Sequence, residues 1–163
     1  MDDRTVKSLW PWFVRPTVGW AFDTDKLGGP RIGTEAGYFL KLKDKNADGV
    51  MDVFGLDFGV FGETDPTKPS LWATGGRFRW KYNYGWLSFA LGTGASLRNA
   101  STDGTKVQAG IPFDGQIGFL FDMFIIGGGV VYYPNAAPSN NLGEFKIGTD
   151  LLKVYTVLTD TTD

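Results

Sequence analysis

Apolar and polar residues alternate at every second position in eight stretches of this chain. An extended strand points successive side chains to opposite faces of a sheet, so this period predicts β-strands. Most of the stretches are long for a soluble sheet and could cross a bilayer when tilted. The sequence therefore predicts an all-β fold, with residues 1–163 in a single domain. We expect the strands at 9–22, 31–43, 50–62, 71–84, 86–98, 106–121, 124–134 and 143–157.

The connections between these stretches alternate in length. Those after the second, fourth and sixth strands are short, whereas longer ones are expected at 23–30, 63–70, 99–105 and 135–142. In an up-and-down barrel, alternate connections lie at the same end. Tight turns and both termini should then share one end, and loops the other. This arrangement predicts an eight-stranded antiparallel up-and-down β-barrel.

The two faces of the strands differ sharply in chemistry. In the fourth stretch Phe78 and Trp80 fall on one face, and Arg77, Arg79 and Lys81 fall on the other. The charged face of the strands is also the glycine-rich face. An eight-stranded barrel has a narrow interior, where glycine would make room for long charged side chains. We therefore expect the apolar face to meet lipid, as in a transmembrane barrel. A soluble lipocalin-like barrel, with the apolar face inside, is the alternative.

Two sets of side chains follow from this orientation. Charges inside a narrow lumen are costly unless they pair, so we expect one ion-pair network across it. Its predicted members are Arg15, Glu35, Asp57, Arg77, Arg79, Lys81, Asp114 and Asp150. Amphipathic aromatic rings favour the two membrane interfaces. The predicted interface aromatics are Trp10, Trp12, Trp20, Trp72, Trp80, Tyr82, Tyr84, Trp86 and Tyr132, with Phe22 and Tyr133 at the same level as Trp20.

The short connection at 44–52 reads DKNADGVMD, which fits the pattern D-x-N-x-D-G-x-x-D. It resembles the calcium loops of EF-hand-like and dockerin-like repeats, where alternate oxygen ligands wrap a hard cation. The resemblance implies ligands from Asp44, Asn46, Asp48 and Asp52 side chains and from the Val50 carbonyl. The twelfth position is glycine, where an EF-hand has a bidentate Glu. The alternative is a hairpin turn rich in Asp and Asn.

Composition excludes several classes of function. The chain has no Cys and no His, so disulfides, thiolate metal sites and histidine-dependent catalysis are excluded. We expect no enzymatic activity and no cofactor apart from calcium. The net charge of -2 argues against a nucleic-acid partner. The N-terminus is not a signal peptide. We therefore expect either the mature form of an exported protein with an added Met, or a designed sequence.

In strand number, loop alternation, outward aromatics and inward charges, the whole chain resembles the eight-stranded bacterial outer-membrane barrel family, of the OmpA transmembrane-domain and OmpW-like kind. The resemblance implies an outer-membrane location. It also implies lipid bilayer, lipopolysaccharide or detergent as partner, and leaves a protein partner in a larger complex open. Such proteins usually end their last strand with an aromatic residue, whereas here Tyr155 precedes the end by several residues. The expected role is a structural element, anchor or scaffold; the alternative is a narrow pore or small-solute conduit.

Overall fold

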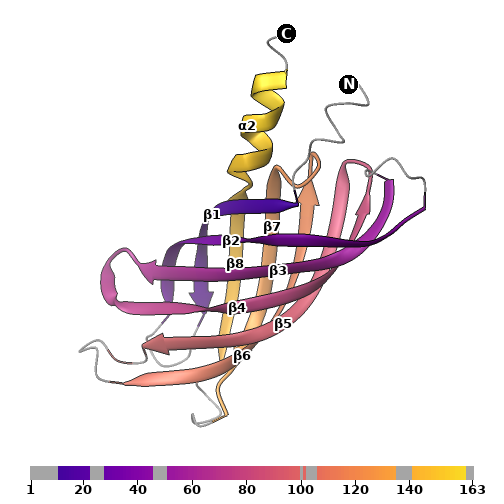
Figure 1. Ribbon diagram of the computed structural model, residues 1–163. Helices are drawn as coiled ribbons and strands as arrows, with labels where there is room; N and C mark the ends of the chain where they lie inside the picture. The colour runs from indigo at the N-terminus through magenta and orange to yellow at the C-terminus, as the bar shows by residue number, and fades with distance from the viewer. Residues whose placement is uncertain are drawn as a thin grey trace.

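The computed structural model describes residues 11–22, 28–45, 51–99, 101, 106–134 and 141–160. Their eight strands form one closed antiparallel barrel in chain order (Figure 1), which confirms the predicted fold class. No helix in this part of the chain has the length and apolar character needed to cross a membrane. The elements are β1 (Trp12–Phe22), β2 (Gly29–Asp44), β3 (Met51–Asp65), β4 (Lys68–Tyr84), β5 (Leu87–Asn99), β6 (Val107–Phe119), β7 (Phe124–Tyr132), β8 (Leu142–Thr149) and α2 (Leu151–Asp160).

The strands are staggered around the barrel. Following paired residues once around it from Trp12 leads back to β1 at Phe22, ten residues further on. A stagger of this size in eight strands tilts each strand by about 40° from the barrel axis and leaves an interior that side chains can fill. The path passes through Tyr38, Phe58, Phe78, Thr93, Phe113, Val130 and Gly143.

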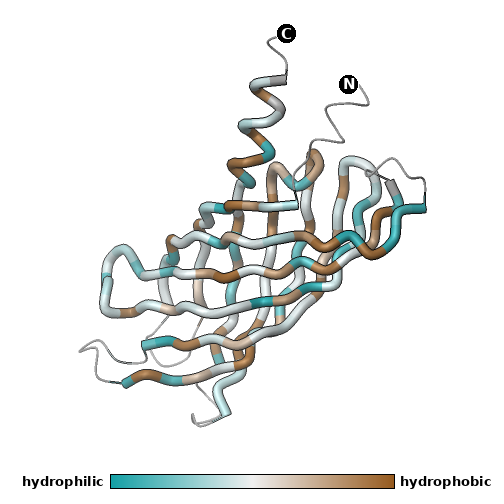
Figure 2. The backbone as a smooth tube through the Cα atoms, in the orientation of Figure 1, coloured by the Kyte–Doolittle hydropathy of each residue, from teal (hydrophilic) through white to brown (hydrophobic). Residues whose placement is uncertain are grey.

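The outer wall is apolar and the interior is charged. Leu91 and Val60 point outward and are 71% and 66% exposed, whereas Arg79 and Asp57 point inward and are 0% and 1% exposed. Along the strands the hydropathy alternates between brown and teal in Figure 2. A barrel that is stable in water has the opposite distribution, because apolar burial drives its folding.

The connection expected as a loop at 63–70 is instead a tight hairpin, so that prediction was wrong. β3 continues to Asp65, β4 begins at Lys68, and a two-residue turn joins them. Asp65 Oδ1 accepts hydrogen bonds from the backbone N–H groups of Thr67 and Lys68, at 2.7 and 3.2 Å. The Asp, Pro and Thr residues that indicated a loop thus form a turn that extends the hairpin.

The last predicted strand, 143–157, was also wrong in its second half. β8 ends at Thr149, and Leu151–Asp160 form helix α2. Asp150 caps this helix: its Oδ1 accepts from the N–H groups of Leu152 and Lys153, at 3.2 and 3.4 Å. An aspartate in this position satisfies N–H groups that have no partner within the helix.

Inward-facing glycines make room for the long charged side chains. Gly92 pairs with Arg79 across β4 and β5. A Cβ at Gly92 would lie 2.4 Å from Arg79 Cγ and 2.2 Å from the carbonyl oxygen of Phe78. Both distances are far shorter than van der Waals contact. Gly62, by contrast, has no atom within 4 Å of its Cβ position.

We predict that Gly92→Ala lowers the free energy of unfolding by about 1–3 kcal/mol, because the added methyl group forces the Arg79 stem and the strand apart. Urea unfolding in lipid vesicles, followed by tryptophan emission, measures the change. Gly62→Ala is the matched control and should be nearly neutral. Equal stability of the two variants would show that the lumen is not tightly packed at Gly92.

Candidate functional site

The barrel interior holds eight cationic and eight carboxylate side chains among the described residues, each no more than 15% exposed. Asp44, the last residue of β2, is a further carboxylate whose side chain is 9% exposed, and it pairs with the exposed Lys41. Apart from that pair, the two signs balance. The cations are Arg15, Arg31, Arg77, Arg79, Lys81, Arg98, Lys146 and Lys153, and the carboxylates are Glu35, Asp57, Glu63, Asp65, Asp114, Asp122, Glu144 and Asp150.

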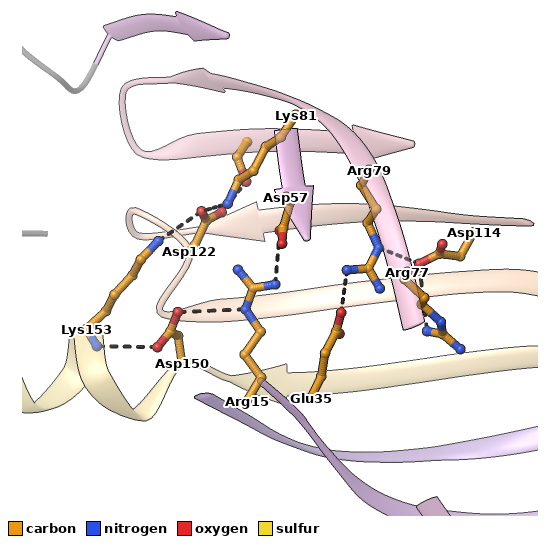
Figure 3. Close-up of polar contacts among 11 residues, drawn as sticks. Arg15, Glu35, Asp57, Arg77, Arg79, Lys81, Asp114, Asp122, Asp150 and Lys153 are labelled. Atoms are coloured by element: carbon orange, nitrogen blue, oxygen red, sulfur yellow. Dashed lines mark hydrogen bonds and ion pairs between the residues drawn. The ribbon is translucent and has the colours of Figure 1, made fainter. Parts of the chain in front are cut away.

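Two arginines from β4 organise the centre of the lumen (Figure 3). Arg79 lies between two carboxylates, with Nη1 2.5 Å from Glu35 Oε1 and Nε 2.6 Å from Asp114 Oδ2. Arg77 lies 3.8 Å from the same Asp114 oxygen and donates to Glu144 Oε2 at 3.2 Å. Glu144 also contacts Lys146 Nζ at 2.9 Å, and Lys146 in turn contacts Glu63. These seven residues come from five strands and form one continuous chain of ion pairs.

A second group lies where the barrel wall meets helix α2. Arg15 Nη1 is 3.3 Å from Asp57 Oδ2, and Arg15 Nε is 3.7 Å from Asp150 Oδ2. Asp150 is thus both the cap of α2 and an ion-pair partner of β1. This contact ties the start of the helix to the lumen.

A third group surrounds Asp122, which lies in the turn between β6 and β7 and points into the barrel at the rim. Its carboxylate accepts from Lys81, from Ser88 and from Lys153 of α2, the last at 3.0 Å. Burial by itself would raise the pKa of Asp122, but Lys153 and Lys81 outweigh it and hold that pKa well below its usual range. Burial raises the pKa of Asp150, and Lys153 and Arg15 offset this only in part.

The turn that presents Asp122 has an uncommon backbone. Leu120, Phe121 and Asp122 have φ values of 50°, 60° and 67°, in the left-handed region. Asp tolerates this region, but bulky side chains such as Leu and Phe are disfavoured there. The contacts of Asp122 with two lysines and a serine hold the turn in this conformation.

Four aromatic rings also point into the lumen, which the sequence analysis did not predict. Each lies beside a cation at a distance at which the ring's negative face attracts it. Tyr133 is 3% exposed, so its prediction as an interface aromatic was wrong: it follows the outward Tyr132 and the next residue must point inward. The pairs are Arg15–Phe13 at 3.8 Å, Arg77–Phe61 at 4.0 Å, Lys81–Phe39 at 5.4 Å, Lys146–Phe61 at 5.4 Å and Arg98–Tyr133 at 3.7 Å.

Little open space is left between these side chains. Near the loop end, Ala21, Val131, Tyr133 and Leu142 form a buried apolar cluster. Three pockets lined by lumen residues have volumes of about 70, 20 and 20 Å³. The two smaller volumes correspond to about one water molecule each.

All eight predicted lumen residues lie inside the barrel, and each contacts an opposite charge within 4.0 Å. Among the described residues the ion pairs divide into separate groups, including an Arg31–Asp65 pair at 3.6 Å. The stagger of the strands distributes these groups along the lumen. Eight further lumen residues were not predicted from the sequence: Arg31, Glu63, Asp65, Arg98, Asp122, Glu144, Lys146 and Lys153.

The sequence pattern around the residues that were not predicted differs from one residue to another. Glu144 and Lys146 alternate with the outward Phe145 and Ile147, so the period of two could have identified them. Arg31 and Arg98 lay at the ends of the predicted strands 31–43 and 86–98 and could have been identified in the same way. Glu63, Asp65, Asp122 and Lys153 lay in segments that were assigned to loops, turns or the wrong element, where alternation gives no information.

Apart from Tyr133, the predicted interface aromatics among the described residues lie on the outer wall. Trp12, Trp20, Trp72, Trp80, Tyr84, Trp86 and Tyr132 are 37–56% exposed. Tyr82 is partly exposed and donates its hydroxyl hydrogen bond to Asp52. Trp10 lies outside the described residues. The register places Trp12, Tyr84 and Trp86 near the rim with the turns, and Trp20, Trp72 and Tyr132 near the loop end.

Of the predicted calcium ligands, only Asp44 and Asp52 lie within the described residues; Asn46, Asp48 and Val50 lie outside them. Asp44 is 3.1 Å from Lys41 Nζ, and Asp52 is 4.0 Å from Lys45 Nζ. Both carboxylates therefore have cationic neighbours that a metal ion would have to displace. Across the described ranges no three acidic, His or Cys side chains are grouped to hold a metal ion.

We predict weak calcium binding at residues 44–52, with a dissociation constant of about 10⁻⁴–10⁻³ M. Isothermal titration calorimetry measures it, and Asp52→Asn should abolish the heat because it removes one charged ligand. A wild-type protein that gives no calcium heat at millimolar concentration would identify the segment as a hairpin turn only.

We predict that Asp122→Asn lowers the free energy of unfolding at neutral pH by about 3–5 kcal/mol, because it leaves Lys81 and Lys153 without their carboxylate. The folded pKa of Asp122 lies below the unfolded value of about 3.9. Its contribution is therefore complete above about pH 4 and is lost as the pH falls through the folded pKa.

Unfolding of wild type and D122N between neutral and strongly acidic pH measures both effects. The difference between their free energies of unfolding should narrow only at the acidic end. Asp52→Asn, whose side chain is 26% exposed, is the control and should cost at most about 1 kcal/mol. A constant difference across the whole pH range would contradict the assigned role of the Asp122 charge.

No protein-family model matches the chain, and no curated protein matches it. A solved structure with a similar fold is that of Ail, the attachment invasion locus protein of Yersinia pestis, in complex with the heparin analogue sucrose octasulfate. The TM-score is 0.49 at 10% sequence identity, and the match covers 85% of this chain and 94% of that one.

Proposed function

We propose that this chain is an integral protein of a bacterial outer membrane and serves there as a structural element or anchor with a closed lumen. The observation that carries the proposal is the inverted distribution of polarity, with an apolar outer wall around an interior of paired charges. In water an apolar surface of this extent would drive association. In a bilayer it is solvated by acyl chains, while closure of the barrel lets the strand backbones pair with one another.

The filling of the lumen favours an anchor over a pore. Arg77 and Arg79 cross the interior to reach carboxylates on β2, β6 and β8, and the apolar cluster lies between them and the loop end. Open aqueous channels occur in barrels with many more strands. The absence of His and Cys from the sequence is consistent with a role that involves no catalysis.

Lysine substitutions at two outward valines test the proposal that the barrel spans a membrane. Val60 lies in the middle of β3, and Val107 is the first residue of β6 at the loop end; they are 66% and 56% exposed. In a bilayer, Val60→Lys should cost about 2–4 kcal/mol and Val107→Lys about 0–1 kcal/mol, because the cost of a lipid-facing charge depends on depth.

Unfolding in phosphatidylcholine vesicles measures both variants. In a soluble protein two exposed positions would respond alike, within about 0.5 kcal/mol. Equal, small effects, together with a wild-type protein that stays folded and monomeric without detergent or lipid, would overturn the proposal in favour of a soluble barrel.

Planar-bilayer recording tests the closed lumen. We predict that the wild-type barrel conducts poorly or not at all. Replacing Arg77 and Arg79 together with Ser should raise the conductance, because it removes the two side chains that cross the lumen. The same variant should be destabilised, since each carboxylate left alone inside costs roughly 3–5 kcal/mol.

Lys41→Ser is the matched control, because the Lys41 side chain is 54% exposed and pairs with Asp44 near a strand end. It should leave conductance unchanged. Steady, large conductance from the unmodified protein would make the narrow pore the better assignment.

A further inference from the structure

Helix α2 is fixed to the barrel by two polar contacts. Asp150, at its start, caps the helix and pairs with Arg15, and Lys153 reaches Asp122 inside the rim at 3.0 Å (Figure 3). Because Lys153 must face the lumen, these contacts also set the rotation of the helix about its own axis. The side of α2 opposite Lys153 therefore faces away from the lumen.

That outer side is apolar and exposed. Leu151, Tyr155 and Leu158 follow at intervals of four and three residues, which places them on one face of the helix. They are 50%, 68% and 64% exposed. Lys153 and Thr156 lie on the other side. The helix is thus amphipathic, with its polar side held by the barrel and its apolar side outermost.

The first turn of α2 adjoins the outer wall of the barrel. Leu152 lines a groove of about 830 Å³ on that wall, together with Trp12, Val14, Tyr38 and Phe58. In Figure 1 the helix extends the line of β8 past the rim and stands clear of the barrel mouth. The helix therefore begins beside the wall, at the level of the rim.

The strand edges indicate the depth of this rim. Pairing of β1 with β8 stops at Thr17–Gly148, so Trp12–Pro16 have no partner on β8 within the described residues. A strand edge is costly in hydrocarbon but tolerated at the polar interface, and Pro16 has no N–H group to satisfy. The seam between β1 and β8 at which α2 begins thus belongs at the interface between headgroups and acyl chains.

We propose that α2 is an interfacial anchor, whose Leu151–Tyr155–Leu158 face lies in the boundary between headgroups and acyl chains of the leaflet at the terminal rim. The proposal rests on the proposed membrane function. Continuity with the lipid-facing wall selects lipid as the occupant of this face. Tyrosine suits that level because its ring is apolar and its hydroxyl is polar.

Site-specific fluorescence tests the anchor, because the chain has no Cys and a single one can be introduced and labelled. The variants are Tyr155→Cys on the apolar face, Thr156→Cys on the polar side and Val60→Cys on the outer wall, each carrying an environment-sensitive fluorophore. They are inserted into vesicles of phosphatidylcholine and phosphatidylglycerol that contain a nitroxide quencher either on the headgroup or deep in the acyl chain.

We expect the emission maximum of the label at 155 to shift to shorter wavelength, and its emission to be quenched by the headgroup nitroxide. The label at 156 should stay water-exposed, and the label at 60 should be quenched by the deep nitroxide. If the label at 60 is quenched but that at 155 behaves like the label at 156, the anchor is overturned and the membrane function stands. If the label at 60 is not quenched, the membrane function itself fails.

A dilution series separates lipid from a second copy of the chain. Lowering the ratio of protein to lipid should leave the signal at 155 unchanged if lipid covers the apolar face. A shift that disappears on dilution would show that α2 packs on α2 of another copy, and would overturn the anchor.

Discussion

The narrowness of an eight-stranded barrel determines most of what its sequence contains. An interior without bulk water cannot hold a charge alone, so every cation brought inside requires a carboxylate within reach. Among the described residues, seven of the eight inward cations each contact a carboxylate, and Arg98 contacts Gln108 and the ring of Tyr133. Arg79 illustrates it best, since its guanidinium is fully buried between Glu35 and Asp114. Such pairs add little net stability by themselves, but the loss of one partner is costly.

In the lumen, charged side chains lie opposite glycines, which leave space for them. Arg79 lies opposite Gly92, and Asp114 pairs with Gly129 on the next strand. Aromatic rings fill what the charges leave, and they attract the same guanidinium and ammonium groups, as Phe61 does with Arg77. Arg77 thus combines ion pairing and cation–π contact with packing, whereas an added methyl group at Gly92 would disturb the packing and the ion pairs of Arg79.

The period of two in residue polarity predicted the strands, and the alternating lengths of their connections predicted the barrel. The period of two also identified the charges of regular strands such as Arg77 and Arg79. It failed where the backbone departs from a strand. Lys153 was assigned to a strand although it lies in a helix. Asp122 was hidden in a turn in which Leu120 and Phe121 are also left-handed, and residues of these two types give no sign of such a backbone. The inward rings were missed because aromatic residues were assumed to face lipid.

The ion pairs of the lumen join residues that are far apart in sequence. Arg79 and Glu35 are 44 residues apart, Arg77 and Glu144 are 67, and Lys146 and Glu63 are 83. Arg15, Arg77, Arg79 and Lys81 all pair with carboxylates outside their own hairpins, so a half-assembled sheet would expose bare ions to hydrocarbon. Crossing of the bilayer and closure of the barrel must therefore be concerted, with the chain held at the polar surface until β8 meets β1.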